Sequence, residues 1–254
     1  MVIGHTGAIG GALLAALTPS FGNRVRGLSR SAAAGGSGGS GDDGATGSGN
    51  TTHVATALDL LDEASIARAA AVVAAEGKDK EGGGGGPLRL IIDATGVLAW
   101  PGHSPERSWR AIDPAAMAHS YAVNAIGPAL LMKHFLPLLP RDDGGAVFAT
   151  LSARVGSIHD NSLGGWYSYR AAKAALHQLV RCASVELRRT HPAAVCVALH
   201  PGTVASRLTA PYSKAGLEVQ SPEDAAARII AVIEALHPAQ SGNVYDHMGV
   251  RIPF

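Results

Sequence analysis

The sequence has little of several things that define other classes of protein. No apolar run approaches the roughly twenty residues that a membrane-spanning helix needs. The formal net charge is only +1, so no overall field would hold nucleic acid or an anionic membrane. We therefore expect neither kind of partner, and a small neutral or anionic ligand instead.

Cysteine is scarce, and the histidines form no metal pattern. The cysteines Cys182 and Cys196 do not have the spacing of a metal site or a redox dithiol, which favours free thiols in a reducing compartment. The histidines include no ligand spacing such as HExxH, so we expect no metal. The N-terminus lacks a basic segment followed by a long apolar stretch, which favours a cytoplasmic protein; organelle targeting stays open if the N-terminus is truncated.

Glycine, in contrast, is abundant, at 32 of 254 residues. Two glycine-rich stretches, Ala32 to Asn50 and Glu76 to Gly86, have too few apolar residues to offset the entropy of ordering them. We interpret both as mobile surface loops inserted into one domain. The length of the chain suits a single α/β domain over residues 1–254.

Outside these loops, short β-type runs alternate with helical patterns. The expected strands are Met1–Ile3, Arg24–Leu28, Val54–Leu58, Leu88–Asp93, Gly145–Leu151 and Ala194–Leu199. The expected helices are Gly10–Leu17, Glu63–Ala75, Pro114–Leu139, Tyr169–Thr190 and one that begins after Ser221. This alternation predicts a Rossmann fold, a doubly wound parallel β-sheet with helices on both faces. The first strand would have only three residues, which suggests a truncated N-terminus.

A glycine turn between the first strand and the first helix is a candidate phosphate site. Gly4 permits the turn, and the free N–H groups of the helix start would face a pyrophosphate. The usual spacing would place a glycine at position 8, where this chain has alanine, with Gly7 beside it. A plain strand-to-helix turn is the alternative. The candidate contacts are Gly4, Thr6, Ile9 and Gly10.

The end of the second strand indicates which dinucleotide the chain would take. This position usually carries an acid for the 2′-hydroxyl of NAD or an arginine for the 2′-phosphate of NADP. Here it carries Ser29 and Arg30 and no acid, which favours NADP(H); a solvated arginine is the alternative. Asp59 and Leu60 follow the third strand, where the carboxylate can accept from an adenine amino group or serve as a turn residue.

Tyr169 and Lys173 are four residues apart in a strongly helical stretch, so their side chains share one face. A free tyrosine has a pKa near 10, too high for acid–base work at neutral pH, and an adjacent ammonium lowers that pKa. The pair therefore predicts a tyrosine that moves protons with lysine as its activator. A solvated helix face is the alternative interpretation.

The order of these motifs resembles that of the short-chain dehydrogenases/reductases, over nearly the whole chain apart from the two glycine loops. The matching landmarks are the Gly4 turn, Asp59-Leu60, Asp93-Ala94-Thr95-Gly96, Asn124, the Ser152 region, Tyr169 with Lys173, and Pro201-Gly202-Thr203-Val204. Ser152 to Ile158, Gly164 to Arg170 and Ser241 to Tyr245 are further similar to the C-factor-like and sniffer-like carbonyl reductase branch.

The resemblance implies a role for each matching residue. Tyr169 would be the general acid/base, and Lys173 would hold the nicotinamide ribose and lower the tyrosine pKa. Ser152 would hydrogen-bond the substrate carbonyl oxygen, and Asn124 would hold a water in a proton relay. The remaining cofactor contacts that it implies are Ala94, Gly96, Pro201, Gly202, Thr203 and Val204, with Ser206 as an addition.

Two departures from the family pattern bear on these roles. The family usually has two adjacent serines with the second catalytic, and that second position is Ala153 here, so Ser152 is the candidate and Ser157 the fallback. Ser152 faces away from the substrate unless the strand end bends, because successive strand residues point to opposite faces. Ala94 stands where an asparagine is usual, which affects the cofactor contact of the fourth strand.

The sequence thus predicts an NADP(H)-dependent oxidoreductase that acts on a small carbonyl or alcohol substrate, with reduction as the favoured direction. The rival hypothesis is an NADP(H)-binding sensor or signalling module with little turnover, and a third is a product that fails to fold. Trp100, Trp109 and Trp166 are candidates for the substrate pocket, with core packing an equal alternative for Trp109. The resemblance also implies a homodimer or homotetramer.

Overall fold

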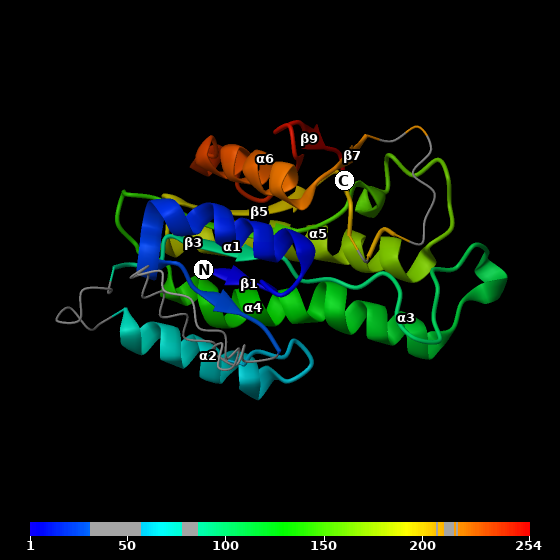
Figure 1. Ribbon diagram of the computed structural model, residues 1–254, viewed down its shortest axis with the longest axis horizontal. Helices are drawn as coiled ribbons and strands as arrows, with labels where there is room; N and C mark the ends of the chain where they lie inside the picture. Colours follow the sequence, from blue (N-terminus) through cyan, green and yellow to red (C-terminus); the bar gives the residue numbers. More distant parts are fainter. Residues whose placement is uncertain (31–56, 78–85, 207, 211–215, 217) are drawn as a thin grey trace, which may run out of the picture.

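The computed structural model describes residues 1–30, 57–77, 86–206, 208–210, 216 and 218–254. A seven-stranded sheet lies at its centre, in the order β2-β1-β3-β4-β5-β8-β9 (Figure 1). The strands are β1 (Val2–Ile3), β2 (Gly27–Leu28), β3 (Leu90–Asp93), β4 (Ala146–Leu151), β5 (Ala194–His200), β8 (Val244–Asp246) and β9 (Arg251–Ile252). All neighbours pair in parallel except β8 and β9, which confirms the predicted doubly wound sheet and adds an antiparallel edge strand.

Helices cover both faces of this sheet, as the alternating pattern predicted (Figure 1). One face carries α1 (Ala8–Phe21) and α6 (Pro222–Glu234), and the other carries α2 (Glu63–Glu76), α4 (Gly127–Phe135) and α5 (Tyr167–Thr190). Alternate residues of β4 therefore enter different cores: Phe148 packs on the α5 side and Ala149 on the α1 side. This alternation fixes which way the residues after β4 point.

The predicted helix Pro114–Leu139 is a nearly continuous helical stretch with a π-helical turn inside it. The α-helix α3 (Pro114–Tyr121) is followed by π-helix at Ala122–Ile126, then α4, and a 3₁₀ turn at Leu136–Leu138. A π-helical turn inserts one extra residue into a helical turn and is frequent at functional sites. Asn124 lies at its centre.

Several predicted boundaries were wrong. Residues Gly22–Arg24 form a 3₁₀ turn, so the strand predicted from Arg24 is only Gly27–Leu28. Sequence periodicity also missed β8, β9 and a small separate sheet of β6 (Thr203–Val204) and β7 (Val219–Gln220). These strands are two or three residues long, too short for a period to be visible.

Some predictions fall wholly or partly on residues that the structure does not describe. The first glycine-rich stretch lies outside the described residues, as does most of the second, of which Glu76 ends α2. Of the strand predicted at Val54–Leu58, only residues 57 and 58 are described, and Ala57 forms an isolated parallel bridge with Ser29. No helix in the described part of the chain is long and apolar enough to cross a membrane.

Candidate active site

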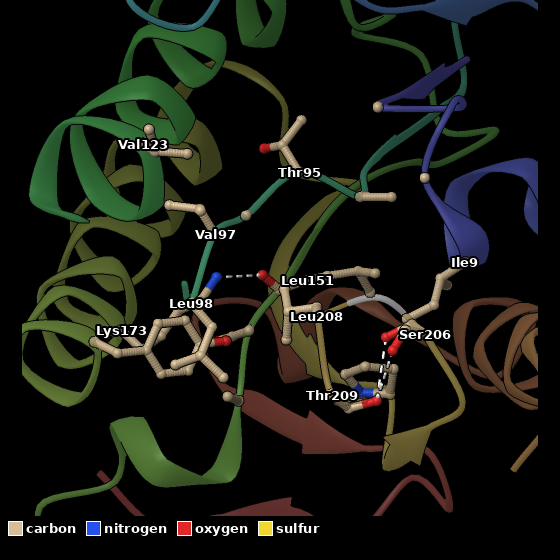
Figure 2. A pocket seen from close by; sticks show the side chains of 18 of the residues that line it. Ile9, Thr95, Val97, Leu98, Val123, Leu151, Lys173, Ser206, Leu208 and Thr209 are labelled. Carbon is tan, nitrogen blue, oxygen red and sulfur yellow. Dashed lines mark hydrogen bonds between the residues drawn. The ribbon is translucent and has the colours of Figure 1, made fainter. Parts of the chain in front are cut away.

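The carboxyl ends of the parallel strands open onto a cavity of about 1490 Å³. Figure 2 shows Val123 and Lys173 on one side of the cavity and Ile9 and Ser206 on the other, with Leu208 between them. Ligand sites in this class of sheet lie at this edge, and a typical small-molecule pocket has about 300 to 1,000 Å³. The cavity therefore has room for a ligand larger than one small metabolite.

The glycine turn lines one end of this cavity through backbone atoms. Gly4 has φ +81°, a left-handed conformation that favours glycine, and the Gly7 N–H donates to the Gly4 carbonyl at 3.0 Å. A Cβ on Gly10 would lie 2.3 Å from that carbonyl oxygen, so only glycine fits there. Helix α1 then begins at Ala8, and because Ala8 lines the cavity, the positive end of the helix faces it. The helix start has no side-chain cap and no acid in its first turn. Of the predicted contacts, Gly4, Thr6, Ile9 and Gly10 all line the cavity.

The residues predicted to bind the adenosine part of the cofactor all line this cavity. Ser29 is buried and Arg30 exposed, and both line the cavity with Asp59 and Leu60. The Asp59 carboxylate accepts from the backbone N–H of Leu61 at 3.0 Å, which is the turn role considered as its alternative. The arginine is thus the cation that borders this part of the cavity.

Tyr169 and Lys173 lie on one face of α5, as their spacing predicted. The Lys173 side chain is buried, and its Nζ lies 5.7 Å from the centre of the Tyr169 ring. The ammonium also donates to the Leu151 carbonyl at 3.0 Å, which fixes it at the end of β4. Both residues line the cavity, so the pair is not a solvated helix face.

Burial sets the protonation of this pair. It lowers the pKa of Lys173 to about 8, with the carboxylate of Asp93 acting in the opposite direction. It also raises the pKa of Tyr169 well above its ordinary value. The net direction is the opposite of the lowering expected from the lysine, because burial of the phenol raises its pKa. The effect of the ammonium on the phenolate stays a prediction. The phenol is protonated at neutral pH.

Asn124 is fully buried and does not line the cavity. Its amide accepts from the Val97 N–H at 3.0 Å, and donates to the Val97 carbonyl at 2.8 Å and the Ser120 carbonyl at 3.1 Å. The side chain therefore fastens the segment after β3 to the π-helical turn. This segment includes Gly96, where a Cβ would lie 3.2 Å from the Asn124 amide oxygen and 3.6 Å from the Lys173 Nζ. The role predicted for Asn124 in a water relay stays a prediction.

Ser152 belongs to the cavity wall, but its hydroxyl lies 2.7 Å from Nε2 of His177, a buried residue of α5. The neighbouring Ala153 also lines the cavity and brings no hydroxyl. Ser157, the fallback, is fully buried, accepts from the Asp160 N–H and does not line the cavity. Sequence reasoning missed His177, because contact between residues 25 positions apart leaves no local pattern.

A second buried contact that the sequence did not reveal holds the start of α5. Trp166, the residue before this helix, has φ +52° and supplies no side-chain cap. Instead, the buried carboxylate of Glu106 accepts from both the backbone N–H and the hydroxyl of Ser168. A carboxylate satisfies the free N–H groups of a helix start, so Glu106 fixes the turn that carries Tyr169.

The remaining predicted residues divide between the cavity and the surface. Those in the cavity wall are Ala94, Gly96, Pro201, Gly202, Thr203, Val204, Ser206, Trp100 and Trp166. Trp109 is 64% exposed and is not part of that wall, so neither of its predicted roles is observed. His200, at the end of β5, also lines the cavity and was missed; burial lowers its pKa to about 4. Within the described residues, no group of three or more His, Cys, Asp or Glu could hold a metal ion.

Known proteins resemble this chain in sequence. The family model described as short chain dehydrogenase matches residues 2–216. The C-signal protein of Myxococcus xanthus is 33% identical over 172 residues, which cover 66% of this chain and 94% of that protein. A 1-hydroxy-2-glutathionyl-2-methyl-3-butene dehydrogenase of a Rhodococcus species is 36% identical over 120 residues, 47% of this chain and 50% of that protein.

Solved structures resemble it in fold. The NADPH-bound carbonyl reductase from chicken fatty liver has a TM-score of 0.79 at 24% identity, covering 100% of this chain and 97% of that one. The carbonyl reductase Sniffer of D. melanogaster has a TM-score of 0.78 at 21% identity, covering 100% and 98%. Identities this low establish the shared fold and no more.

Proposed function

This chain belongs to the short-chain dehydrogenase family and is similar to the C-signal protein, and from that premise we propose that it is an NADPH-dependent carbonyl reductase. The observation that carries the proposal is the buried Tyr169–Lys173 pair at the wall of a cavity that begins at the glycine turn. The substrate would be a small aldehyde, ketone or quinone bound between Tyr169 and the indole of Trp166.

The residues around the cavity fit NADP(H). The turn packs so closely that a Cβ would meet protein atoms at 3.0 Å on Gly4 and at 2.3 Å on Gly10. Both glycines line the cavity through backbone atoms, which would let a pyrophosphate approach the free N–H groups of the helix start. Arg30 would take the 2′-phosphate through its planar guanidinium, with Ser29 beside it. Asp59 and Leu60 would border the adenine, and residues 201–204 with Ala94 and Gly96 would border the nicotinamide end.

The proton chemistry follows from the state of the two α5 side chains. NADPH, when bound, supplies the hydride that reduces the carbonyl carbon. Tyr169 is a protonated phenol because burial raises its pKa, so its hydroxyl can donate the proton that the carbonyl oxygen needs. Lys173, held by the Leu151 carbonyl, stabilises the phenolate that remains until a proton from solvent restores the phenol. A protonated phenol suits reduction better than alcohol oxidation.

A second candidate function is NADP(H) binding with little turnover, as a sensor or signalling module would show. The observation that favours it is the bond between Ser152 and His177, together with the absence of a hydroxyl at Ala153. A substrate oxygen bound by Tyr169 alone would lose one donor, and one oxyanion donor is worth about a hundredfold or more in rate.

The test is NADPH oxidation, followed at the nicotinamide absorbance, with a panel of aldehydes, ketones and quinones. We expect turnover in the wild type and a fall of about 10² to 10⁴-fold in Tyr169→Phe, at unchanged NADPH affinity. Tyr167→Phe is the matched control, because Tyr167 begins the same helix and does not line the cavity. Full turnover in Tyr169→Phe would contradict the proposal, and NADPH binding without consumption would favour the second candidate.

A further inference from the structure

The catalytic face of α5 continues one turn beyond the lysine. Tyr169, Lys173 and His177 follow at intervals of four residues, so all three side chains lie along one face of the helix. His177 is 2% exposed and Ser152, its partner at the end of β4, is 5% exposed. The bond of 2.7 Å between them therefore lies in the protein interior, one turn of α5 beyond Lys173.

This bond acts on the peptide unit that holds the lysine. The carbonyl of Leu151 accepts from the Lys173 Nζ at 3.0 Å, and the N–H of Ser152 in the same peptide unit donates to the Leu199 carbonyl at 2.7 Å. Strand β4 ends at Leu151. The Ser152 side chain adds a third attachment next to this peptide unit, to His177 of α5.

The direction in which Ser152 points follows from the pleat of β4. Phe148 faces the core on the α5 side, and even-numbered residues continue that side toward the strand end. Ser152 accordingly meets His177 on α5, whereas Leu151 packs in the other core. A hydroxyl held by the helix in this way supports the strand end rather than standing free for a substrate.

The imidazole is neutral and bonds Ser152 through one ring nitrogen. Burial, with a smaller contribution from Lys173, lowers the pKa of His177 to about 4. Its Nδ1 has no hydrogen-bond partner among the described residues. The bond to the Ser152 hydroxyl is made by Nε2, and the tautomer of the ring sets which of the two atoms donates. A Cβ on Gly156 would lie 2.7 Å from the His177 ring, so the ring is held tightly in this orientation.

We propose that His177 is a positioning residue that acts through Ser152 to hold the Leu151 carbonyl, and with it the ammonium of Lys173, beside Tyr169. The inference rests on the proposed reductase function. Ser152 then contributes to the reaction as the partner of His177, by holding the peptide unit that binds Lys173. It does not contact the substrate oxygen.

The experiment compares His177→Leu, which removes the hydrogen bond, with His177→Gln, whose amide can donate or accept a hydrogen bond at a similar reach. We expect kcat to fall about five- to tenfold in His177→Leu, the worth of one hydrogen bond, and to recover in His177→Gln. The second readout is the pH profile of alcohol oxidation, in which Tyr169 must lose its proton. A displaced ammonium stabilises the phenolate less, so this limb should move to higher pH in His177→Leu and return in His177→Gln.

Ser152→Ala and the double variant separate this inference from the alternatives. Two residues that act as one unit give a double variant no slower than either single one. Ser152→Ala should therefore lower kcat and move the pH limb as His177→Leu does. The double variant should show effects no larger than those of either single variant. Ser152→Ala also keeps the inference testable if His177→Leu does not fold.

Other outcomes would overturn the inference in different ways. A large loss in Ser152→Ala with His177→Leu at wild-type rate would make Ser152 the partner of the substrate oxygen and would overturn the positioning role. An unshifted pH limb in His177→Leu, with Tyr169→Phe inactive, would overturn it while leaving the proposed function intact. Wild-type protein without any turnover would overturn the proposed function, and this inference with it.

Discussion

The turn after β1 and the face of α5 border the same cavity but are built from different groups. The turn presents backbone N–H groups, and its tight packing at Gly4 and Gly10 leaves no space for a Cβ. The α5 face presents the buried side chains of Tyr169 and Lys173, each with a pKa shifted by burial. The first region should therefore be sensitive to added volume, and the second to lost hydrogen bonds and to pH.

The largest effect should come from adding one methyl group to the turn. In Gly10→Ala the Cβ would lie 2.3 Å from the Gly4 carbonyl oxygen, a backbone atom that must move. We expect a loss of about 3 kcal/mol in the free energy of unfolding and at least a tenfold weaker NADPH affinity. Denaturant unfolding and NADPH fluorescence titration would measure both.

Gly11→Ala is the matched control for this variant. Its Cβ would lie 3.2 Å from the His5 carbonyl oxygen, and alanine favours the helix. Its stability and NADPH affinity should stay close to those of the wild type. Equal losses in the two variants would mean that the turn is no more crowded than the rest of α1, and the contrast between the regions would not hold.

A smaller effect should come from Arg30→Ala, which removes the cation at the adenosine side of the cavity. If Arg30 binds the 2′-phosphate, NADPH affinity should fall about ten- to a hundredfold while NADH affinity stays the same. Arg24→Ala, at an exposed turn, should change neither affinity. Parallel losses for NADPH and NADH in Arg30→Ala would show that the arginine does not select the phosphate.

Glu106 tests the rigidity of the α5 region. Glu106→Ala leaves the backbone N–H and hydroxyl of buried Ser168 without their acceptor, so unfolding should become about 1 to 3 kcal/mol easier. Glu106→Gln keeps one carbonyl oxygen as an acceptor, so its free energy of unfolding should fall less than that of Glu106→Ala. Denaturant unfolding measures the difference. A Glu106→Ala protein as stable as the wild type would show that the helix start needs no partner from this segment.

A further effect concerns acid, and His177 supplies the part of it that belongs to the α5 face. Burial lowers the pKa of His177 and of His200 to about 4, whereas unfolded histidine has a pKa near 6.5. Between these values the unfolded chain binds more protons, so folding stability falls as the pH drops from 6.5 to 4. Because His177→Gln removes one of these groups, its folding free energy should fall by about 2 to 3 kcal/mol less than that of the wild type over this range. Parallel pH curves of the melting temperature for the two proteins would contradict the assignment of His177 as a buried neutral group.

Much of the fold and part of the site followed from local patterns. The alternation of apolar runs and helices predicted the layers, and the glycine turn predicted the start of α1 within two residues. The i, i+4 spacing was sufficient to bring Tyr169 and Lys173 to one helix face. Short strands such as β8 were not predictable, because their pairing with β5 and not their own sequence defines them.

The sequence by itself determined the elements whose geometry is local: a turn that only glycine permits, a helix face with a tyrosine and a lysine, and an arginine after β2. The tertiary structure alone decided which groups those residues meet. Ser152 binds His177, Glu106 holds Ser168 and Asn124 holds Val97 across 25, 62 and 27 positions of the chain. Such contacts depend on how strands and helices pack, and burial, which reversed the expected pKa shift of Tyr169, exists only once the chain has folded.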